Sequence, residues 1–348
     1  MRRHGCRRRI FMKHDQRRIL LLALLLALLL ALLLSGCAAR QAKTECYAMD
    51  TVMDITVYGK NAEQAAKDCE QELYRLEALL SCREPEAELA QVNAGQAEPS
   101  AETAALVRHA LELSRETGGA YDPALGALME AWGFSTGECR VPDVSEREAA
   151  LRRSGAELIE LTEDSFTLRG GAQLDLGGIG KGYAAARLRA LLTQEGIESA
   201  ILSLGGNVCA VGVKPDGSDW QIGLQDPENT AEIFGMVAVR DAGVVTSGGY
   251  QRWFEQDGVR YHHILDPETG CPAESGLLSV SVVSADDTLA DALSTALYVM
   301  GAERGAQLWR ESGLDFEAVW VTEDGSVLIT EGLQSAYRSE RAYQVVTR

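Results

Sequence analysis

The chain lacks an excess of positive charge, and this absence limits the partners it can have. Its 348 residues include 33 Lys and Arg against 51 Asp and Glu, which gives a formal net charge of -18 at pH 7. Residues 1–36 hold eight basic residues and one acid, so removing their +7 from -18 leaves -25 for residues 37–348. A surface of this sign repels phosphate backbones and anionic lipids, and it tolerates cations. Nucleic acid is therefore not expected as a partner.

Closely spaced cysteines of the kind that bind zinc are also missing. Six of the eight cysteines lie beyond residue 37, and they are Cys46, Cys69, Cys82, Cys139, Cys209 and Cys271. No two of them have zinc-site spacing. Disulfides are permitted outside the cytoplasm but are not required there, and the sequence predicts no particular pairing.

The N-terminus has an apolar run that is short for a transmembrane helix. The unbroken run Ile19 to Leu34 has sixteen residues of Ile, Leu and Ala, whereas a spanning helix needs about 20. Eight Arg and Lys residues precede it, as in the charged and apolar regions of a secretory signal peptide. The run ends in Leu34-Ser35-Gly36-Cys37, which resembles the bacterial lipobox.

The lipobox resemblance implies cleavage before Cys37 and attachment of lipid to that cysteine. Residues 1–36 would then be a lipoprotein signal peptide, and residues 37–348 would be the mature domain, anchored to the membrane through Cys37. An uncleaved N-terminal anchor is the alternative. In both cases the rest of the chain is expected to be extracytoplasmic.

Two nucleotide-binding fingerprints are absent from the glycine-rich stretch Leu174 to Tyr183, which reads LDLGGIGKGY. A Walker A loop would need Gly in place of Asp175 and Ser or Thr in place of Gly182, and the dinucleotide fingerprint fails on spacing as well. Glycines let a backbone approach a ligand closely, and a lysine suits phosphate. The stretch is therefore either a phosphate-binding turn or only a tight turn from strand to helix.

Alternation and helical periodicity predict a chain of mixed helices and strands. Helices are expected over residues 61–80, 101–117, 145–154, 184–192, 287–300 and 303–312, with Asn61 as a cap. Strands are expected over residues 54–59, 157–161, 165–168, 199–204, 208–213, 220–224, 236–240, 261–265 and 278–283, with a hairpin over 317–330 and a short tether over 40–44. No repeat or long linker indicates a second domain. The predicted fold class is α+β, with antiparallel sheets covered by helices.

Short polar motifs flanked by glycine occur at distant points of the chain, and loops of this kind often carry function. They are MDTVM at 49–53, GAYDP at 119–123, DLGGIGKG at 175–182, LGGN at 204–207, HILDPETG at 263–270 and ADALST at 290–295. The six motifs in this order resemble the FAD:protein FMN transferase family, the ApbE-type flavin transferases. The resemblance runs from about Tyr47 to Val321, which is nearly all of the mature chain.

The resemblance implies an Mg²⁺-dependent enzyme that cleaves the diphosphate of FAD and releases AMP. The FMN would go to a Thr or Ser hydroxyl of an acceptor protein in an extracytoplasmic electron-transport system. By the same resemblance, contacts with FAD belong to Met49, Ala120, Tyr121, Asp122, Asp175 and Lys181. The metal would be held by the Gly178 carbonyl with Asp291, Ser294 and Thr295. His263 and Asp266 lie in the motif that implies catalysis.

These roles agree with the chemistry of the residues. Asp291 and Thr295 are four residues apart on an expected helix, so both oxygens project from one face, as an Mg²⁺ ion with few protein ligands would require. The alternative is that they form only the solvated face of that helix, opposite Leu289 and Leu293. The imidazole of His263 can accept the proton of a target hydroxyl near neutral pH, although a lone strand histidine is more often structural.

Three positions depart from the family pattern. Arg83 stands where the family commonly has an aromatic residue, a place expected to lie over the flavin ring, and a guanidinium can also stack on such a ring. Asp50 and Gly180 replace a usual Gly and Ala. Flavin binding is therefore expected to be altered but retained.

Two other functions are compatible with the sequence. One is an FAD pyrophosphatase, in which water replaces the protein hydroxyl and the products are free FMN and AMP. The other is a lipoprotein that binds flavin without catalysis. The predicted metal pair and His263 argue against this second alternative.

We expect Cys37 to become the lipidated first residue of the mature protein, because the apolar run before it is short for a span. Several acyl chains on one cysteine would hold the protein firmly, whereas a single chain binds membranes only marginally. Mass spectrometry of the membrane fraction tests this expectation. Recovery of a chain that still carries residues 1–36 would contradict it.

Overall fold

The computed structural model describes residues 18, 19, 22 and 40–348, and the statements below concern those residues. Cys37 and the predicted cleavage site lie outside the described residues, so both stay predictions. No described helix combines the length and the apolar character needed to cross a membrane. Residues Gln41–Arg348 form one compact unit.

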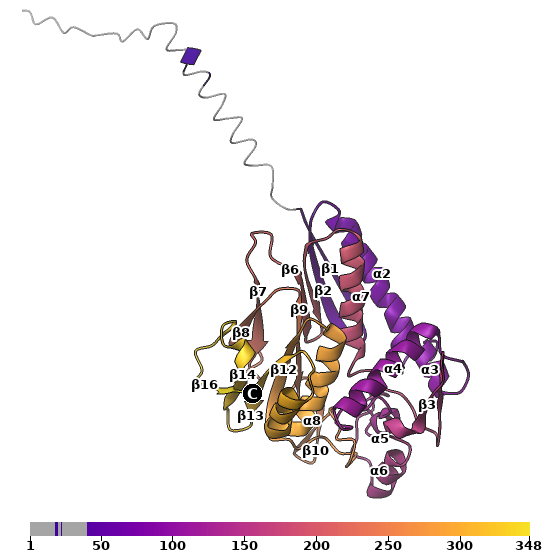
Figure 1. Cartoon of the computed structure of the whole chain (residues 1–348). Helices are drawn as coiled ribbons and strands as arrows, with labels where there is room; N and C mark the ends of the chain where they lie inside the picture. The colour runs from indigo at the N-terminus through magenta and orange to yellow at the C-terminus, as the bar shows by residue number, and fades with distance from the viewer. Residues whose placement is uncertain (1–17, 20–21, 23–39) are drawn as a thin grey trace, which may run out of the picture. The chain divides into compact units, whose positions relative to one another are not determined.

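A nine-stranded sheet is the centre of that unit (Figure 1). In spatial order its strands are β1 (Gln41–Ala48), β2 (Thr51–Tyr58), β5 (Ser199–Leu204), β6 (Asn207–Gly212), β9 (Ala242–Gly248), β12 (Leu277–Ser284), β13 (Glu317–Thr322), β14 (Val327–Thr330) and β16 (Tyr343–Val346). Neighbouring strands are antiparallel except for the parallel pair β14 and β16. The predicted α+β class with antiparallel sheets is confirmed.

Three small sheets complete the β structure. They are β15-β8-β7, formed by β7 (Trp220–Gln225), β8 (Ile233–Val239) and β15 (Tyr337–Arg338), and the hairpins β3 (Ile159–Leu161) with β4 (Phe166–Leu168) and β10 (Trp253–Gln256) with β11 (Val259–His262). The turn of the last hairpin is Asp257-Gly258, and both residues have positive φ, 53° and 77°. Asp-Gly is a favoured pair for such two-residue turns.

Helices cover the large sheet and the loops beside it (Figure 1). They are α2 (Ala62–Leu80), α3 (Glu88–Asn93), α4 (Ala101–Glu116), α5 (Gly126–Ala131), α6 (Val144–Leu151), α7 (Gly180–Gln194) and α8 (Asp287–Glu311), with short 3-10 turns at Ala156–Leu158 and Glu331–Leu333. The apolar stripe Ala65, Cys69, Leu73 and Leu76 of α2 packs in one cluster with strand residues such as Ile55. This stripe is the helical pattern that the sequence predicts.

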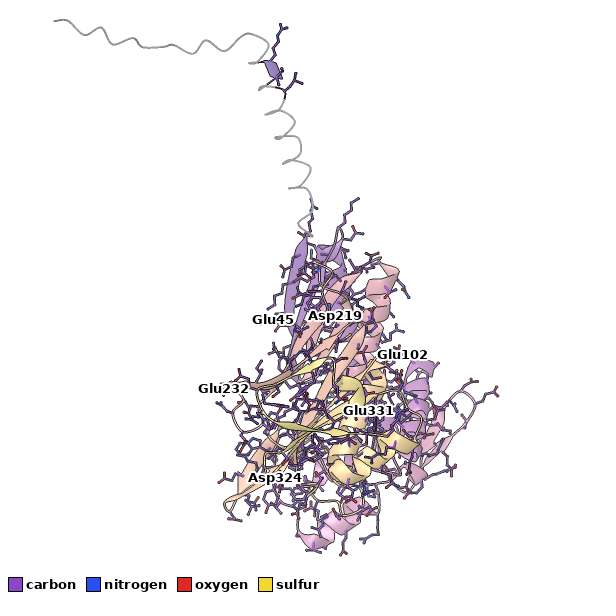
Figure 2. All side chains as sticks on the ribbon, turned by 60° about the vertical axis from the view of Figure 1, so that its left-hand side comes forward. Glu45, Glu102, Asp219, Glu232, Asp324 and Glu331 are labelled. Carbon is purple, nitrogen blue, oxygen red and sulfur yellow. The ribbon has the colours of Figure 1, made fainter. Side chains whose placement is uncertain are left out.

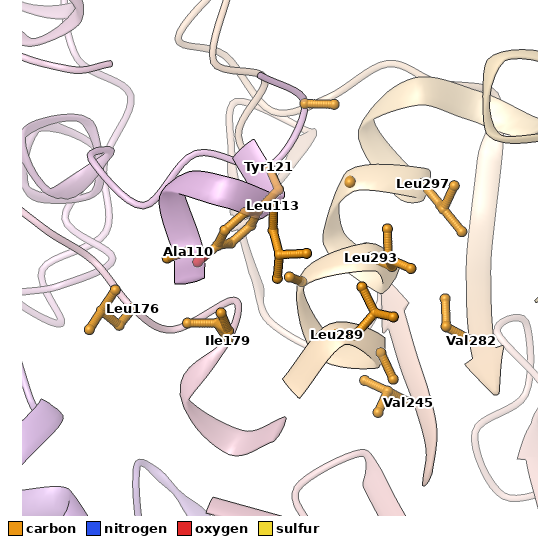
Figure 3. Packing of buried hydrophobic residues seen from close by; sticks show 14 of the residues in the cluster. Ala110, Leu113, Tyr121, Leu176, Ile179, Val245, Val282, Leu289, Leu293 and Leu297 are labelled. Atoms are coloured by element: carbon orange, nitrogen blue, oxygen red, sulfur yellow. The ribbon is translucent and has the colours of Figure 1, made fainter. Parts of the chain in front are cut away.

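The helix α8 is buried on nearly all sides of its first half, because it lies between the sheet and the loop after α4. Figure 3 shows Leu289 and Leu293 on the side of α8 that faces Val245 of β9 and Val282 of β12, with Tyr121 on another side. Polar side chains are also buried on this half of the helix, among them Asp287, Asp291 and Ser294. Because buried polar groups are normally hydrogen-bonded, these residues need partners or a function.

Acidic residues are spread over the unit. Figure 2 labels six of them on well-separated parts of the chain: Glu45, Glu102, Asp219, Glu232, Asp324 and Glu331. This distribution agrees with the acidic composition of the chain.

The prediction of a tether is wrong, and the prediction that Asn61 caps a helix holds for its position but not for its side chain. Residues 40–44 are not a tether, because from Gln41 the chain forms β1, which pairs along its whole length with β2. Only Cys46 and Ala48 of this strand are buried, and both lie near its end. Its first residues therefore show no clear alternation of apolar and polar side chains. Asn61 precedes α2, but its side chain makes no capping hydrogen bond. Its carbonyl oxygen accepts from the N–H groups of Gln64 and Ala65 instead.

Helices α7 and α8 approach so closely at Gly182 that a side chain does not fit there. A Cβ on Gly182 would lie 2.3 Å from the carbonyl oxygen of Asp287 and 2.6 Å from the Cβ of Asp291. A Cβ on Gly180, one half-turn earlier, would meet only the mobile end of the Met49 side chain at 3.3 Å. The two glycines therefore offer a matched comparison.

We expect Gly182→Ala to lower the free energy of unfolding by about 1–3 kcal/mol, which is typical of overpacking. Helix propensity alone would favour Ala over Gly by about 1 kcal/mol, so a loss reports the clash between the helices. Denaturant unfolding of this variant beside Gly180→Ala is the measurement. Equal stability of the two variants would show that α7 and α8 can separate at no cost.

Candidate active site

Two turns and the end of strand β9 meet at one edge of the large sheet. The register Ala48 with Thr51 sets the turn between β1 and β2, and Leu204 with Asn207 sets the turn between β5 and β6. Asn207 in turn pairs with Val245 of β9. Segments that are far apart in sequence therefore end side by side.

A cavity of about 580 Å³ opens at this edge. It brings together most of the predicted site residues: Met49, Ala120, Tyr121, Asp122, Asp175, Gly178, Lys181, His263, Asp291 and Thr295. Pockets of this size hold small-molecule ligands in many proteins.

Ser294 and Asp266 do not line this cavity. Ser294 is fully buried behind it, where its hydroxyl donates to the Asp291 carbonyl oxygen at 2.8 Å and lies 2.8 Å from the hydroxyl oxygen of Ser247. Asp266 borders a second hollow of about 310 Å³, and its carboxylate accepts from the backbone N–H of Glu268 at 2.8 Å. This hydrogen bond shows that Asp266 stabilises the turn that follows it. Its catalytic role stays a prediction.

The turn between β1 and β2 brings Met49 to the cavity with an unusual backbone. Met49 and Asp50 have φ of 50° and 63°, in the left-handed region that residues other than Gly seldom adopt. The backbone N–H of Met49 donates to a carboxylate oxygen of Glu77 at 2.8 Å, which helps to hold the turn. Strained backbone of this kind is common at ligand sites.

Two carboxylates of the cavity organise the loops around them. Asp122 accepts from the backbone N–H groups of Ala124 at 2.7 Å and Ala156 at 2.9 Å, while burial raises the pKa of its carboxyl. Asp175 accepts from the N–H of Gly177 at 2.7 Å. The glycine-rich stretch is thus a tight turn that also lines the cavity, so the two sequence-based alternatives do not exclude each other.

Asp291, Thr295, Gly178 and Tyr121 converge at one corner of the cavity. A Cβ on Gly178 would lie 3.2 Å from both the Thr295 hydroxyl oxygen and the Tyr121 ring. One oxygen of Asp291 accepts from the N–H of Gly182 at 2.7 Å, and the other has no hydrogen-bond partner among the described residues. Asp291 is only 3% exposed, so the alternative of a solvated helix face is wrong for this residue.

The corner fits an oxygen-liganded cation better than a zinc-type site. In the described part of the chain, no three His, Cys, Asp or Glu residues cluster as metal ligands. The predicted set instead has one carboxylate, two hydroxyls and a carbonyl, and Mg²⁺ accepts few protein ligands when a phosphate completes its shell. The buried Tyr121 hydroxyl has no partner within the described residues, and burial and the nearby Asp291 raise its pKa. A protonated hydroxyl there can donate to a bound oxygen.

His263 is held as a neutral base. Its Nδ1 lies 3.2 Å from the Arg252 carbonyl oxygen, which can only accept, so Nδ1 carries the hydrogen and Nε2 stays unprotonated. Burial, followed by the charges of Arg252 and Lys181, lowers the pKa of His263 to about 3. The imidazole is therefore uncharged in the neutral range, which is the form in which Nε2 can accept a proton.

The hairpin of β10 and β11 fixes the position of His263, which follows its second strand. Phe254 and Tyr261 stack across the hairpin with ring centroids 5.3 Å apart, and Trp132 and Phe134 pack against them. Such aromatic contacts stabilise beyond their buried area. The predicted strand over 261–265 is wrong in its bounds, because β11 runs from Val259 to His262. Its partner strand β10 was not predicted, so the hairpin was missed.

Two arginines line the cavity, of which Arg83 was expected there and Arg252 was absent from the predicted site. Arg83 forms an ion pair with Asp50 at 2.7 Å, so the two departures from the family pattern contact each other. Arg252 lines the cavity beside His263. The Asp257-Gly258 turn was the sequence signal that could have found Arg252, because a hairpin around it places residues 252 and 263 opposite each other.

Comparisons with known proteins show what this chain is similar to. Residues 49–320 match the model of the ApbE family. The chain is 36% identical over 324 residues to the FAD:protein FMN transferase of Treponema pallidum, covering 86% of this chain and 89% of that protein. It is 31% identical over 295 residues to the enzyme of the same name from Escherichia coli K12, covering 80% and 83%.

Solved structures show the same fold. The ApbE protein of Thermotoga maritima superposes with a TM-score of 0.80 at 32% identity, covering 86% of this chain and 100% of that one. The flavin transferase ApbE from Vibrio cholerae superposes with a TM-score of 0.76 at 27% identity, covering 86% and 99%.

Proposed function

The chain belongs to the ApbE family, and from this premise we propose that it uses Mg²⁺ to attach FMN from FAD to a Thr or Ser hydroxyl of an extracytoplasmic protein. Its relatives are named FAD:protein FMN transferases, so the chain is a transferase that moves flavin from FAD to a protein. The metal, the acceptor hydroxyl and the location are the parts that we propose.

The observation that carries the proposal is the free Nε2 of His263 in the same cavity as Lys181 and Asp291. A hydroxyl is barely acidic at neutral pH, so its attack on phosphorus needs a positioned base. The neutral ring of His263 is in the form that can accept its proton. A site built only to store flavin would not need this group.

The reaction is balanced by one bond formed and one bond broken. The hydroxyl oxygen of the acceptor bonds to the phosphorus of the FMN half, and the bond from that phosphorus to the bridging oxygen breaks. The bridging oxygen and its electron pair leave with AMP. His263 takes the hydroxyl proton, and Lys181 faces the charge that develops on the phosphate oxygens.

Asp291, Thr295 and the Gly178 carbonyl would hold the metal at their corner of the cavity, with Ser294 directly behind Asp291. When bound, Mg²⁺ neutralises charge on the diphosphate. The chain itself fixes the Asp291 carboxylate through the Gly182 N–H and presents its second oxygen without a protein partner. The Asp291 carboxylate is therefore held in place by the protein itself, and its second oxygen is available to a metal ion.

The extracytoplasmic location rests on the N-terminal sequence alone. The basic segment, the apolar run and the lipobox before Cys37 support a lipoprotein at the membrane surface. Its acceptors would be proteins of extracytoplasmic electron transport that carry a Thr or Ser for flavin attachment.

We expect Asp291→Ala to lose about a hundredfold or more of the Mg²⁺-stimulated AMP release from FAD, since a bound metal contributes several kcal/mol of charge stabilisation. Glu303→Ala, at an exposed carboxylate of the same helix, is the matched control and should behave as the wild type. The measurement is AMP formed across an Mg²⁺ titration. Unchanged activity of a folded Asp291→Ala would remove this residue from the metal site.

We expect His263→Ala to lose about 10²- to 10⁴-fold in the rate of attaching FMN to an acceptor with a suitable Thr, which is the usual contribution of a positioned base. The variant should still bind FAD. Covalent flavin fluorescence in a denaturing gel and AMP release are scored separately, and His109→Ala on α4 is the control.

The same comparison separates the transferase from a pyrophosphatase. Labelling by His263→Ala at the wild-type rate would remove His263 from the mechanism. AMP release by a wild type that labels no acceptor would favour the pyrophosphatase. The third sequence-based alternative, a carrier without catalysis, is not supported, because the relatives are named as transferases.

A further inference from the structure

Two guanidinium groups meet at one backbone oxygen in the wall of the cavity. Arg83 and Arg252 each donate to the carbonyl oxygen of Phe134. Both side chains line the cavity. Two positive groups so close to each other raise the electrostatic energy of this wall unless anions compensate them.

The chain provides a direct counter-ion for only one of the two. Asp50 lies 2.7 Å from Arg83. Among the described residues, no carboxylate forms an ion pair with Arg252, and Asp175 and Asp50 act on it only at longer range. Burial and the charge of Arg83 lower the pKa of Arg252. An arginine remains charged under these conditions, so its charge is left uncompensated.

Lys181 is a second cation of this kind. Its ammonium donates to the Gly177 carbonyl oxygen at 3.4 Å, and it forms no ion pair within the described part of the chain. Arg252 and Lys181 both line the cavity and both act electrostatically on His263, so the two charges lie near the same histidine. Two uncompensated cations match the two negative charges of a diphosphate ester.

We propose that Arg252 binds the diphosphate of FAD together with Lys181, whereas Arg83 is withheld from it by Asp50. The inference rests on FAD as the substrate, and it concerns binding independently of the transfer step. A guanidinium suits this role because its planar donors form paired hydrogen bonds with phosphate oxygens.

The backbone of Arg252 joins this substrate site to the base. Its carbonyl oxygen accepts from the His263 backbone N–H at 3.1 Å and from Nδ1 at 3.2 Å. The side chain that holds the phosphate and the carbonyl that orients the imidazole therefore belong to one residue. Besides burial, the groups that lower the pKa of His263 are Arg252, Lys181 and His262. A diphosphate between the first two offsets their charge and makes His263 a stronger base when FAD is bound.

Arg252→Gln and Arg260→Gln test the proposal as a matched pair. Arg260 lies on the same hairpin, over the Trp253 ring at 4.0 Å, and does not line the cavity. FAD is titrated calorimetrically into the full-length proteins with EDTA present, so that protein cations alone are measured. At low salt we expect Arg252→Gln to bind FAD about 10- to 100-fold more weakly, as for a lost charged hydrogen bond. Arg260→Gln should match the wild type.

Salt distinguishes lost charge from lost packing. The loss in Arg252→Gln should shrink at high salt, because salt screens the attraction that the wild type retains. Unchanged FAD binding, or an equal loss at both salt concentrations, overturns the proposal. A wild type that binds FAD in this salt-dependent way but labels no acceptor would refute the proposed transfer and leave the role of Arg252 standing.

A second variant decides the question if Arg252→Gln does not fold. Asp50→Asn keeps a residue that tolerates the left-handed backbone and leaves Arg83 without its carboxylate. A second uncompensated guanidinium then adjoins the diphosphate site. Tighter FAD binding at low salt supports the proposal, and unchanged or weaker binding overturns it.

Discussion

The contact between α7 and α8 at Gly182 is the constraint on which the site depends. Because Gly182 has no side chain, its backbone N–H reaches the Asp291 carboxylate of the neighbouring helix. The same contact holds the start of α7, and therefore Lys181 and the turn at Gly178, against the first half of α8. One close approach of two backbones thus sets the positions of a carboxylate, a cation and a carbonyl.

The second half of the site depends on sheet register and on a separate hairpin. Antiparallel pairing puts the turns at Met49 and Gly205 at one edge of the sheet. The hairpin of β10 and β11 places His263, which follows it, in the lining of the cavity at that edge. The stacked rings of Phe254 and Tyr261 stabilise this hairpin, which is separate from the large sheet. The corner at Asp291 and the imidazole of His263 therefore belong to separate structural elements, and both line the cavity.

The sequence predicted the class of fold, and most of its candidate site residues line the cavity. Asp291 and Thr295 share a face because helical spacing requires it. The pairing of Asp50 with Arg83 and the closeness of Arg252 to His263 were not predicted, because each joins segments whose contact depends on tertiary structure or on an unrecognised turn. Asp266 shows that closeness in sequence does not ensure a place in the same site. It lies in the same motif as His263, but its carboxylate accepts a hydrogen bond within the following turn and borders a different hollow.

The balance of charge in the cavity differs from that of the chain as a whole. An acidic protein repels an anionic dinucleotide at long range, so attraction has to arise locally. Backbone N–H groups donate to the carboxylates of Asp122, Asp175 and Asp291. These hydrogen bonds offset part of the negative charge of the three carboxylates. Lys181 and Arg252 form no direct ion pair with a carboxylate of the described residues. The acids accept from backbone N–H groups, whereas the two cations donate only to backbone carbonyl oxygens and keep their positive charge. This difference supports the proposed local site for a diphosphate on a surface that otherwise repels anions.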